Sequence, residues 1–184
     1  MSLTDPSPSS STVFRRKQRA VGFMMALAAA ITVLVLGIAF STLRSETPAP
    51  FDARLEYTLR LDLFIVAWLL ATIANVARLR FFSERDFGAD VSEGESRKVV
   101  EARAILQNTL EQVVLAVLTS LAVTASFNPS AALVESLVGL FAAGRLLFWL
   151  GYRYGAKGRA LGFGLTFYPS AIALFASATV IASH

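Results

Sequence analysis

Charged and amide side chains lie inside two of the most apolar segments of this sequence. Gln107, Asn108 and Glu111 fall within residues 104–126, and Arg145 falls within residues 131–152. An ionisable group inside a membrane span costs several kcal/mol unless it faces a partner or water. These residues are therefore candidates for a binding site, where a guanidinium and a carboxylate can hold a ligand that carries both signs of charge.

The spacing of these residues places them on common helix faces. Residues four apart share one face of an α-helix, so Arg103, Gln107 and Glu111 form one stripe, with Asn108 beside it. At 1.5 Å per residue, Glu111 and Arg145 each lie about 10 Å from the same membrane face, on adjacent antiparallel helices. We therefore expect Glu111 and Arg145 to form an ion pair. The alternative is that these polar groups only join helices through hydrogen bonds.

Five apolar stretches can position these side chains, and each is long enough for a membrane-spanning helix of about 20 residues. The chain has 184 residues, of which 55% are hydrophobic. Lipid offers no partners to backbone groups, and the stretches are too long for barrel strands, so they must be helices. The sequence therefore predicts an all-α membrane bundle with spans at residues 20–43, 61–82, 104–126, 131–152 and 160–183.

The Lys and Arg residues predict how this bundle lies in the membrane. With the N-terminus inside and five alternating spans, 14 of the 17 Lys and Arg fall on the inner side, which agrees with the positive-inside rule. We expect residues 1–19 to be a disordered cytoplasmic tail and residues 20–43 to be an uncleaved signal anchor. The C-terminal His184 is then outside.

Composition argues against several functions. The chain has no cysteine, so it forms no disulfide or thiolate metal site, and any thiol chemistry must use the thiol of a ligand. No metal site is expected. The net charge of +4 is spread over helix ends instead of one soluble patch, which argues against nucleic-acid binding. Asp62 and Glu135 are expected near outer helix ends, where an exposed charge costs little.

Two motifs resemble the MAPEG family of membrane proteins. The sequence R-A-I-L-Q-N-T-L-E at residues 103–111 is similar to the family's R-A-x-x-N-x-x-E element. The segment from G-R-L-L-F-W-L-G-Y at residues 144–152 to Arg159 is similar to the pattern of Arg, Gly-Tyr and Arg that ends the family's third helix. The resemblance implies that residues 57–184 form the family's four-helix core, with residues 20–43 as an additional helix.

The resemblance also implies a site and a co-substrate. Glutathione would be bound between neighbouring subunits of a homotrimer in the inner or plasma membrane of a bacterium. Arg159 would be the catalytic residue, because its guanidinium would stabilise the glutathione thiolate. The residues that would bind glutathione are Asn108, Glu111, Arg145 and Tyr152, with Gln107 and Arg103 beside them.

Two functions remain open on this scaffold. The first is a glutathione-dependent transferase or peroxidase, which acts on a lipophilic electrophile or hydroperoxide that arrives from the bilayer lipids. The second is a non-catalytic protein that binds a lipid or assists a partner. Arg159 favours catalysis, whereas Phe148, at a position where leukotriene synthases have tyrosine, favours the second function. A channel or transporter is disfavoured because the outer halves of the last three spans offer no polar path.

Overall fold

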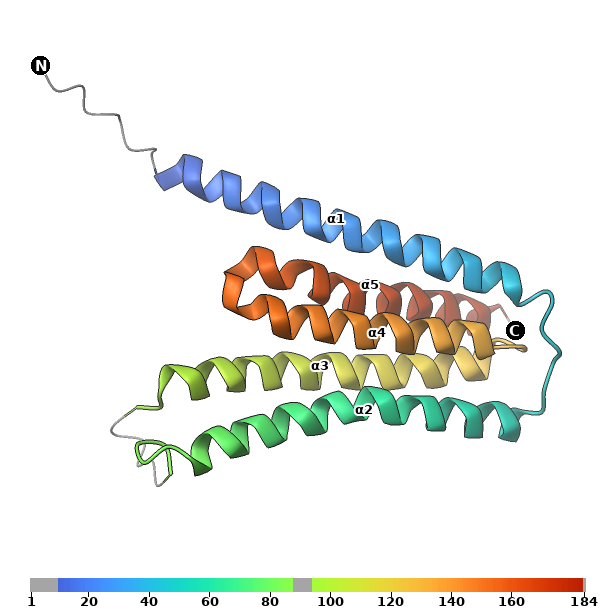
Figure 1. The fold of residues 1–184 in the computed structure, drawn as a ribbon. Helices are drawn as coiled ribbons and strands as arrows, with labels where there is room; N and C mark the ends of the chain where they lie inside the picture. The colour runs from blue at the N-terminus through green and yellow to red at the C-terminus, as the bar shows by residue number, and fades with distance from the viewer. Residues whose placement is uncertain (1–9, 88–93, 184) are drawn as a thin grey trace, which may run out of the picture.

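The computed structural model describes residues 10–87 and 94–183, and these form a bundle of antiparallel helices (Figure 1). The elements are α1 (Ser10–Thr42), α2 (Phe51–Phe81), α3 (Arg97–Ser126), α4 (Ala131–Gly151), the 3-10 helix η1 (Tyr152–Tyr154) and α5 (Gly155–Ala182). No strand occurs in the described part of the chain, so the predicted all-α fold is confirmed. Residues 1–9 of the predicted tail and the terminal His184 lie outside the described residues.

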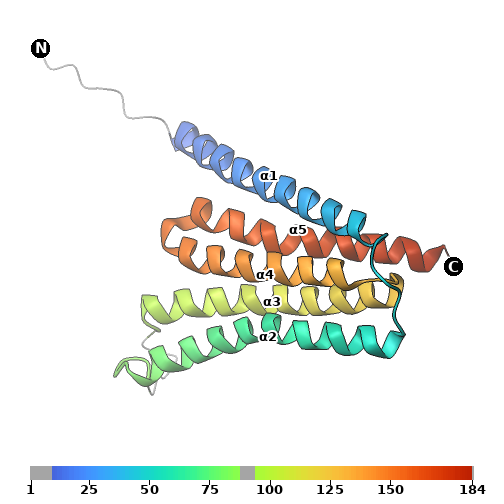
Figure 2. The same ribbon diagram turned by 45° about the vertical axis from the view of Figure 1, so that its right-hand side comes forward.

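Four stretches of the described chain are long and apolar enough to cross a membrane: Phe14–Thr42, Phe51–Phe81, Arg97–Ser126 and Ala131–Ala182. The last has 52 residues and folds back on itself, because the chain reverses at η1 and at Gly155. Gly155 has φ of 72°, a conformation that favours glycine. The reversal gives α4 and α5, which pack side by side (Figure 2). The five predicted spans therefore correspond to the five α-helices.

Several helices begin earlier than the predicted spans. α1 begins at Ser10, so the basic residues 15–19, which were expected in a disordered tail, are helical. α3 begins at Arg97, where the side chain of Ser96 caps the helix by accepting a hydrogen bond from the Val99 amide. Hydropathy marks only the apolar length of a helix, whereas Lys, Arg and Glu are good helix formers that continue it into water.

Glycines allow α4 and α5 to pack very closely. A Cβ on Gly162 would lie 2.3 Å from the backbone nitrogen of Phe148, and one on Gly151 would lie 2.1 Å from the carbonyl oxygen of Gly158. Backbone atoms cannot move aside for such a carbon, so these positions tolerate only glycine without a shift of the helices. We call the turn between the two helices, residues 151–159, the elbow.

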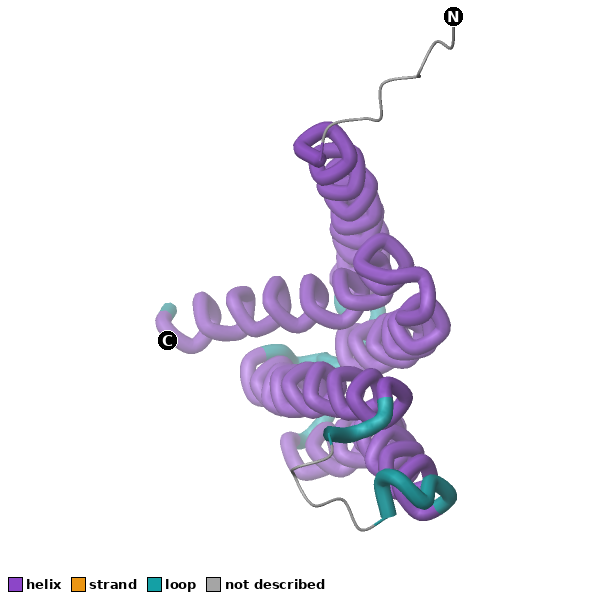
Figure 3. Tube along the Cα trace, turned by 90° about the vertical axis from the view of Figure 1, so that its left-hand side faces the viewer, coloured by secondary structure: helices purple, strands orange, loops and turns teal. Residues whose placement is uncertain are grey.

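α1 lies at the edge of the bundle and packs against α5 and α4, while α2 lies at the opposite edge (Figures 1 and 3). α1 contacts α5 at Ala28, which is fully buried. A Cβ on Gly164 would lie only 2.5 Å from the Cβ of Ala28. Small residues at this crossing let the two backbones come together, as is common between membrane helices.

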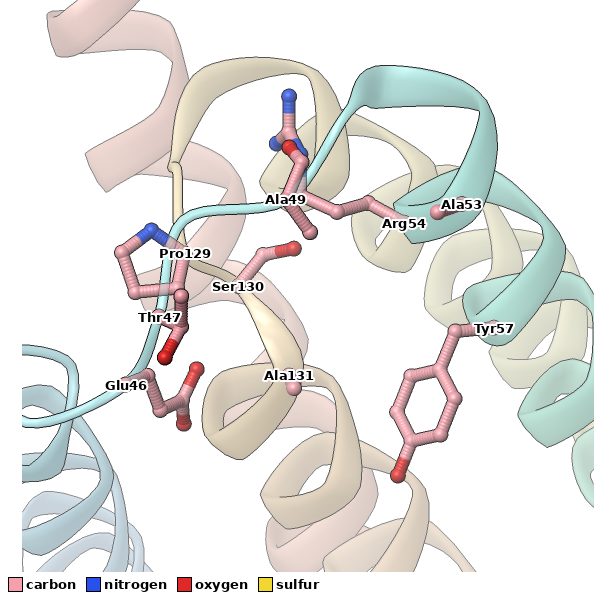
Figure 4. A pocket seen from close by; sticks show the side chains of 9 residues that line it. All are labelled: Glu46, Thr47, Ala49, Ala53, Arg54, Tyr57, Pro129, Ser130 and Ala131. Atoms are coloured by element: carbon pink, nitrogen blue, oxygen red, sulfur yellow. The ribbon is translucent and has the colours of Figure 1, made fainter.

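The connection between α1 and α2 is tied to the turn between α3 and α4, at the end of the bundle away from the elbow (Figure 4). Glu46 Oε1 accepts a hydrogen bond of 2.9 Å from the Ala132 amide, and the Ala49 amide donates to Asn128 Oδ1 at 3.1 Å. Arg54 also donates to backbone carbonyls at the end of α3. These bonds fix the end of α1 relative to the other helices.

Candidate functional site

A cavity of about 520 Å³ opens at the elbow end of the bundle. Three of the predicted site residues lie in its wall, namely Asn108 of α3, Tyr152 of η1 and Arg159 of α5. Small-molecule pockets usually measure about 300–1000 Å³, so this cavity can hold a ligand such as a tripeptide. The remaining wall is apolar and consists of Val21, Met25, Ala104, Phe148, Ala156, Ala160 and Phe163.

Arg159 is the cation of this cavity. It lies near the N-terminal end of α5, and its guanidinium carbon is 5.0 Å from the centroid of the Tyr152 ring. The Tyr152 ring in turn packs edge to face on Phe148, with centroids 5.8 Å apart. A guanidinium on an aromatic face is held by cation–π attraction, and the N-terminal end of a helix favours negative charge. The arrangement can therefore stabilise an anion in the cavity.

Arg145 lies behind the cavity wall and is only 2% exposed. Its Nη1 donates to Asn108 Oδ1 at 2.9 Å, and its Nη2 donates to Thr166 Oγ1 at 2.7 Å. Its guanidinium carbon lies 4.6 Å from the ring centroid of Phe148 and 5.8 Å from that of Phe141. The buried Nε has no hydrogen-bond partner among the described residues. Arg145 thus connects α3, α4 and α5 and holds the Asn108 amide in place.

The predicted ion pair between Glu111 and Arg145 is wrong within this chain. Glu111 instead accepts a hydrogen bond of 2.9 Å from Gln107 Nε2, and both side chains are exposed. Three residues along a helix fall about 60° short of a full turn, so Glu111 is rotated away from the face that carries Asn108. The structure therefore brings Asn108, Arg145, Tyr152 and Arg159 together and leaves Gln107 and Glu111 on an outer face of α3.

Arg103 also lies away from the cavity. Its Nη1 forms an ion pair of 2.9 Å with Glu95, which pairs with Arg80 as well. Hydrogen bonds from Arg80 and then Arg103 hold the pKa of the Glu95 carboxyl below its usual range, because they favour the charged form. Arg103 therefore connects α3 to the end of α2 in this chain.

Asp62 was expected near a helix end but lies inside α2. It is 4% exposed, and both of its carboxylate oxygens accept hydrogen bonds from the Ser120 hydroxyl, at 2.9 and 2.7 Å. α2 begins at Phe51 instead of residue 61, so Asp62 lies about three turns inside the helix. The carboxylate therefore faces α3 in the bundle interior.

Sequence reasoning missed three residues at the site: Val21, Met25 and Thr166. Val21 and Met25 line the cavity, and Thr166 accepts from Arg145. Lipid is as apolar as a protein interior, so an apolar residue on a membrane helix carries no sign of which one it faces. The small residues Ala28 and Gly164, which lie in contact between α1 and α5, are a sequence signal that could have indicated this helix pair.

Long apolar helices, together with a cationic cavity at one end of the bundle, define an integral membrane protein of the helical class. Residues 62–179 match the sequence model of the MAPEG family. This chain belongs to the MAPEG family, whose members are membrane proteins of glutathione and eicosanoid metabolism. The matched residues begin within α2, so α1 precedes them.

Two mammalian proteins are similar in sequence to this chain. Transmembrane protein 79 of Mus musculus is 32% identical over 163 residues, which cover 84% of this chain and 39% of that protein. Transmembrane protein 79 of Bos taurus is 34% identical over 134 residues, which cover 65% of this chain and 32% of that protein. The chain thus spans less than two fifths of the length of these relatives. No solved structure matches it. The expected location in a bacterial membrane stays a prediction.

Proposed function

We propose that this protein is a membrane-bound glutathione-dependent transferase or peroxidase that acts on a lipophilic electrophile or hydroperoxide. The observation that carries the proposal is the cavity at the elbow, where Arg159, Tyr152 and Asn108 face a space with otherwise apolar walls. A polar side suits a charged tripeptide, and an apolar side suits a second substrate that dissolves in lipid.

Arg159 is the residue to which we assign activation. Glutathione supplies a thiol, whose pKa near 8.5 leaves about a few per cent ionised at pH 7. A guanidinium that lowers this pKa by ~2 units makes the thiolate the major form. Arg159 would stabilise the thiolate sulfur, while Asn108 and Tyr152 would bind the peptide. Arg145, which lies behind the wall, would act on the peptide indirectly, because its Nη1 holds the Asn108 amide in place.

The outer face of α3 supports a homotrimer as part of this proposal. Gln107 and Glu111 are exposed on that face of a single chain, although they lie inside a membrane span. Leaving a carboxylate in contact with lipid costs several kcal/mol, so a neighbouring subunit that covers the face relieves this cost. Glutathione bound at such an interface would contact Glu111 through its ammonium group.

The distribution of charge supports a site that faces the cytoplasm. Of the 17 Lys and Arg, 14 belong to the elbow half of the bundle, and this half is inside under the positive-inside rule. In this orientation the N-terminus is cytoplasmic and the C-terminus is outside.

The experiment that tests the proposal follows ultraviolet thiolate absorbance while glutathione is added to the full chain in detergent. Wild type and Arg159→Ala are compared with Arg153→Ala, a matched control on the same elbow whose guanidinium lies 4.7 Å from the Tyr154 ring. We expect a saturable signal in wild type and in the control, and none in Arg159→Ala. No signal in wild type, with calorimetry also showing no binding, would overturn the proposal.

A second cavity favours the alternative function, a non-catalytic protein that binds lipid. It measures about 320 Å³, lies between α1 and the bundle away from the elbow, and has wholly apolar walls: Val33, Leu36, Gly37, Phe40, Val123, Phe127, Leu133, Ile172, Ala173 and Ala176. A Cβ on Gly37 meets nothing within 4 Å, so Gly37→Leu can place bulk there without strain. If native mass spectrometry detects a bound lipid that Gly37→Leu removes, and glutathione does not bind, the alternative is correct.

A further inference from the structure

Two side chains of α1 line the cavity that contains Arg159. Val21 and Met25 are four residues apart, so they share one face of the helix, and both form part of the cavity wall. Phe23 and Leu27 of the same segment point away and are 65% and 39% exposed. α1 therefore turns a defined apolar face toward the cavity.

The packing of α1 holds this face in place. Ala28 packs against α5 at Gly164, and Met25 and Val21 follow about one and two turns nearer to the elbow. Beyond this crossing α1 diverges from α5, as Figure 2 shows. The cavity occupies the space between them. At its other end α1 is tied to the bundle through Glu46. These contacts fix α1 from Ala28 to its C-terminal end, and Val21 and Met25 follow directly from the Ala28 contact.

The chemistry of the wall complements that of the Arg159 side. Val21 and Met25 offer only apolar contacts, and the unbranched thioether of Met25 adapts to different shapes. A ligand whose sulfur is held at Arg159 would extend any apolar group toward α1. We infer that Val21 and Met25 determine which lipophilic substrate the enzyme accepts, and that this substrate is an electrophile with an alkyl tail. The inference rests on the glutathione chemistry proposed above.

A conjugated alkenal is a substrate of this class. The thiolate sulfur forms a bond to the β-carbon, the electron pair of the carbon–carbon double bond moves toward the carbonyl oxygen, and the resulting enolate takes one proton from water. The product is a thioether, and no oxidant or reductant is needed. The alkyl tail would lie against Val21 and Met25, because these are the apolar residues that α1 presents to the cavity.

Binding of S-methylglutathione and S-hexylglutathione, measured by calorimetry on the full chain, tests the wall without catalysis. Met25→Trp fills the cavity side of α1, and Leu27→Trp, about 200° away on the same helix, is the matched control. We expect wild type and the control to bind the hexyl conjugate at least about tenfold more tightly, since burying two methylenes has about this effect. Met25→Trp should lose the gain and keep its affinity for the methyl conjugate.

The outcomes separate this inference from the proposed function. Equal affinity for both conjugates in wild type, or the same loss in both tryptophan variants, would overturn the inference and leave glutathione binding intact. No binding of S-methylglutathione to wild type would overturn both. If Met25→Trp fails to fold, Met25→Ala replaces it, because it adds no bulk. This variant should lose part of the higher affinity for S-hexylglutathione over S-methylglutathione. An unchanged ratio of the two affinities would contradict the role of Met25 in the cavity wall.

Discussion

Thr166→Val tests whether buried Arg145 is held by hydrogen bonds and not by an ion pair. The substitution keeps the shape of the side chain but removes the hydroxyl that accepts a hydrogen bond of 2.7 Å from Arg145 Nη2. Arg145 is 2% exposed and forms no ion pair among the described residues. Its Nε is already without a partner, so the variant leaves a second nitrogen of the buried guanidinium unsatisfied.

The size of the effect follows from this burial. A hydrogen bond to a charged group contributes about 1.5–3 kcal/mol in soluble proteins. Interhelical hydrogen bonds in membranes average only ~0.6 kcal/mol and reach ~1.7. Thr166 is the hydrogen-bond partner of Nη2 in the described structure, so we expect a loss of about 1.5 kcal/mol in the free energy of unfolding, which is roughly a tenfold change in the equilibrium. Arg145→Met removes the charge together with its donors and should cost less.

The assay is reversible unfolding by dodecyl sulfate in mixed micelles, followed by circular dichroism. The double variant Arg145→Met with Thr166→Val should be no less stable than Thr166→Val alone, because the charge that needs Thr166 is gone. If Arg145→Met costs more than Thr166→Val, or if the two losses add, the guanidinium contributes net stability and the reasoning fails.

Three further predictions concern packing and pH. Gly164→Leu should lower stability by about 1–3 kcal/mol because its side chain would meet α1, whereas Gly139→Leu, in open space, should change it little in the same unfolding assay. Ser120→Ala removes the hydroxyl that donates to buried Asp62 and should cost about 1–3 kcal/mol; no change would mean that another group replaces it. The lowered pKa of Glu95 gives stability that is present above about pH 4.3, its unfolded value, and is lost as pH falls through the folded pKa. Hydrogen exchange at the start of α3 should show this loss. Glu95→Gln should weaken the pH dependence and leave the part that comes from Asp86, whose pKa is lowered by hydrogen bonds from Ser83 and Ser96.

The sequence predicted the helices well because their signal is local. Long apolar runs give the spans, and the glycines near residue 155 mark the reversal between α4 and α5. Where two helices are joined by a short turn, the sequence also predicts which of their residues lie at the same depth in the membrane. Depth placed Asn108 in the same half of the membrane as Arg145, and the two are hydrogen-bonded in the structure.

Rotation of a helix about its own axis was harder to predict. Glu111 and Asn108 are three residues apart, and the pattern did not decide which of them faces Arg145. The carboxylate was expected there because its charge is opposite to that of Arg145, whereas in the structure the amide makes the contact. For the same reason, the sequence did not show that Val21 and Met25 face the cavity. In a membrane helix both the lipid face and the packed face are apolar, and only tertiary contacts distinguish them.

The three-residue turn of η1 has a consequence for how the protein enters the membrane. α4 carries Arg145, and a central arginine adds about 2.5–3.5 kcal/mol to the cost of inserting an isolated helix. Asn108 on α3 relieves part of this cost, but the other partner, Thr166, lies on α5, so the rest is relieved when α5 is inside as well. The two helices therefore insert as a single hairpin. If the ribosome is stalled before α5 emerges, α4 should be poorly inserted in wild type. In Arg145→Leu, α4 should insert even when α5 is absent.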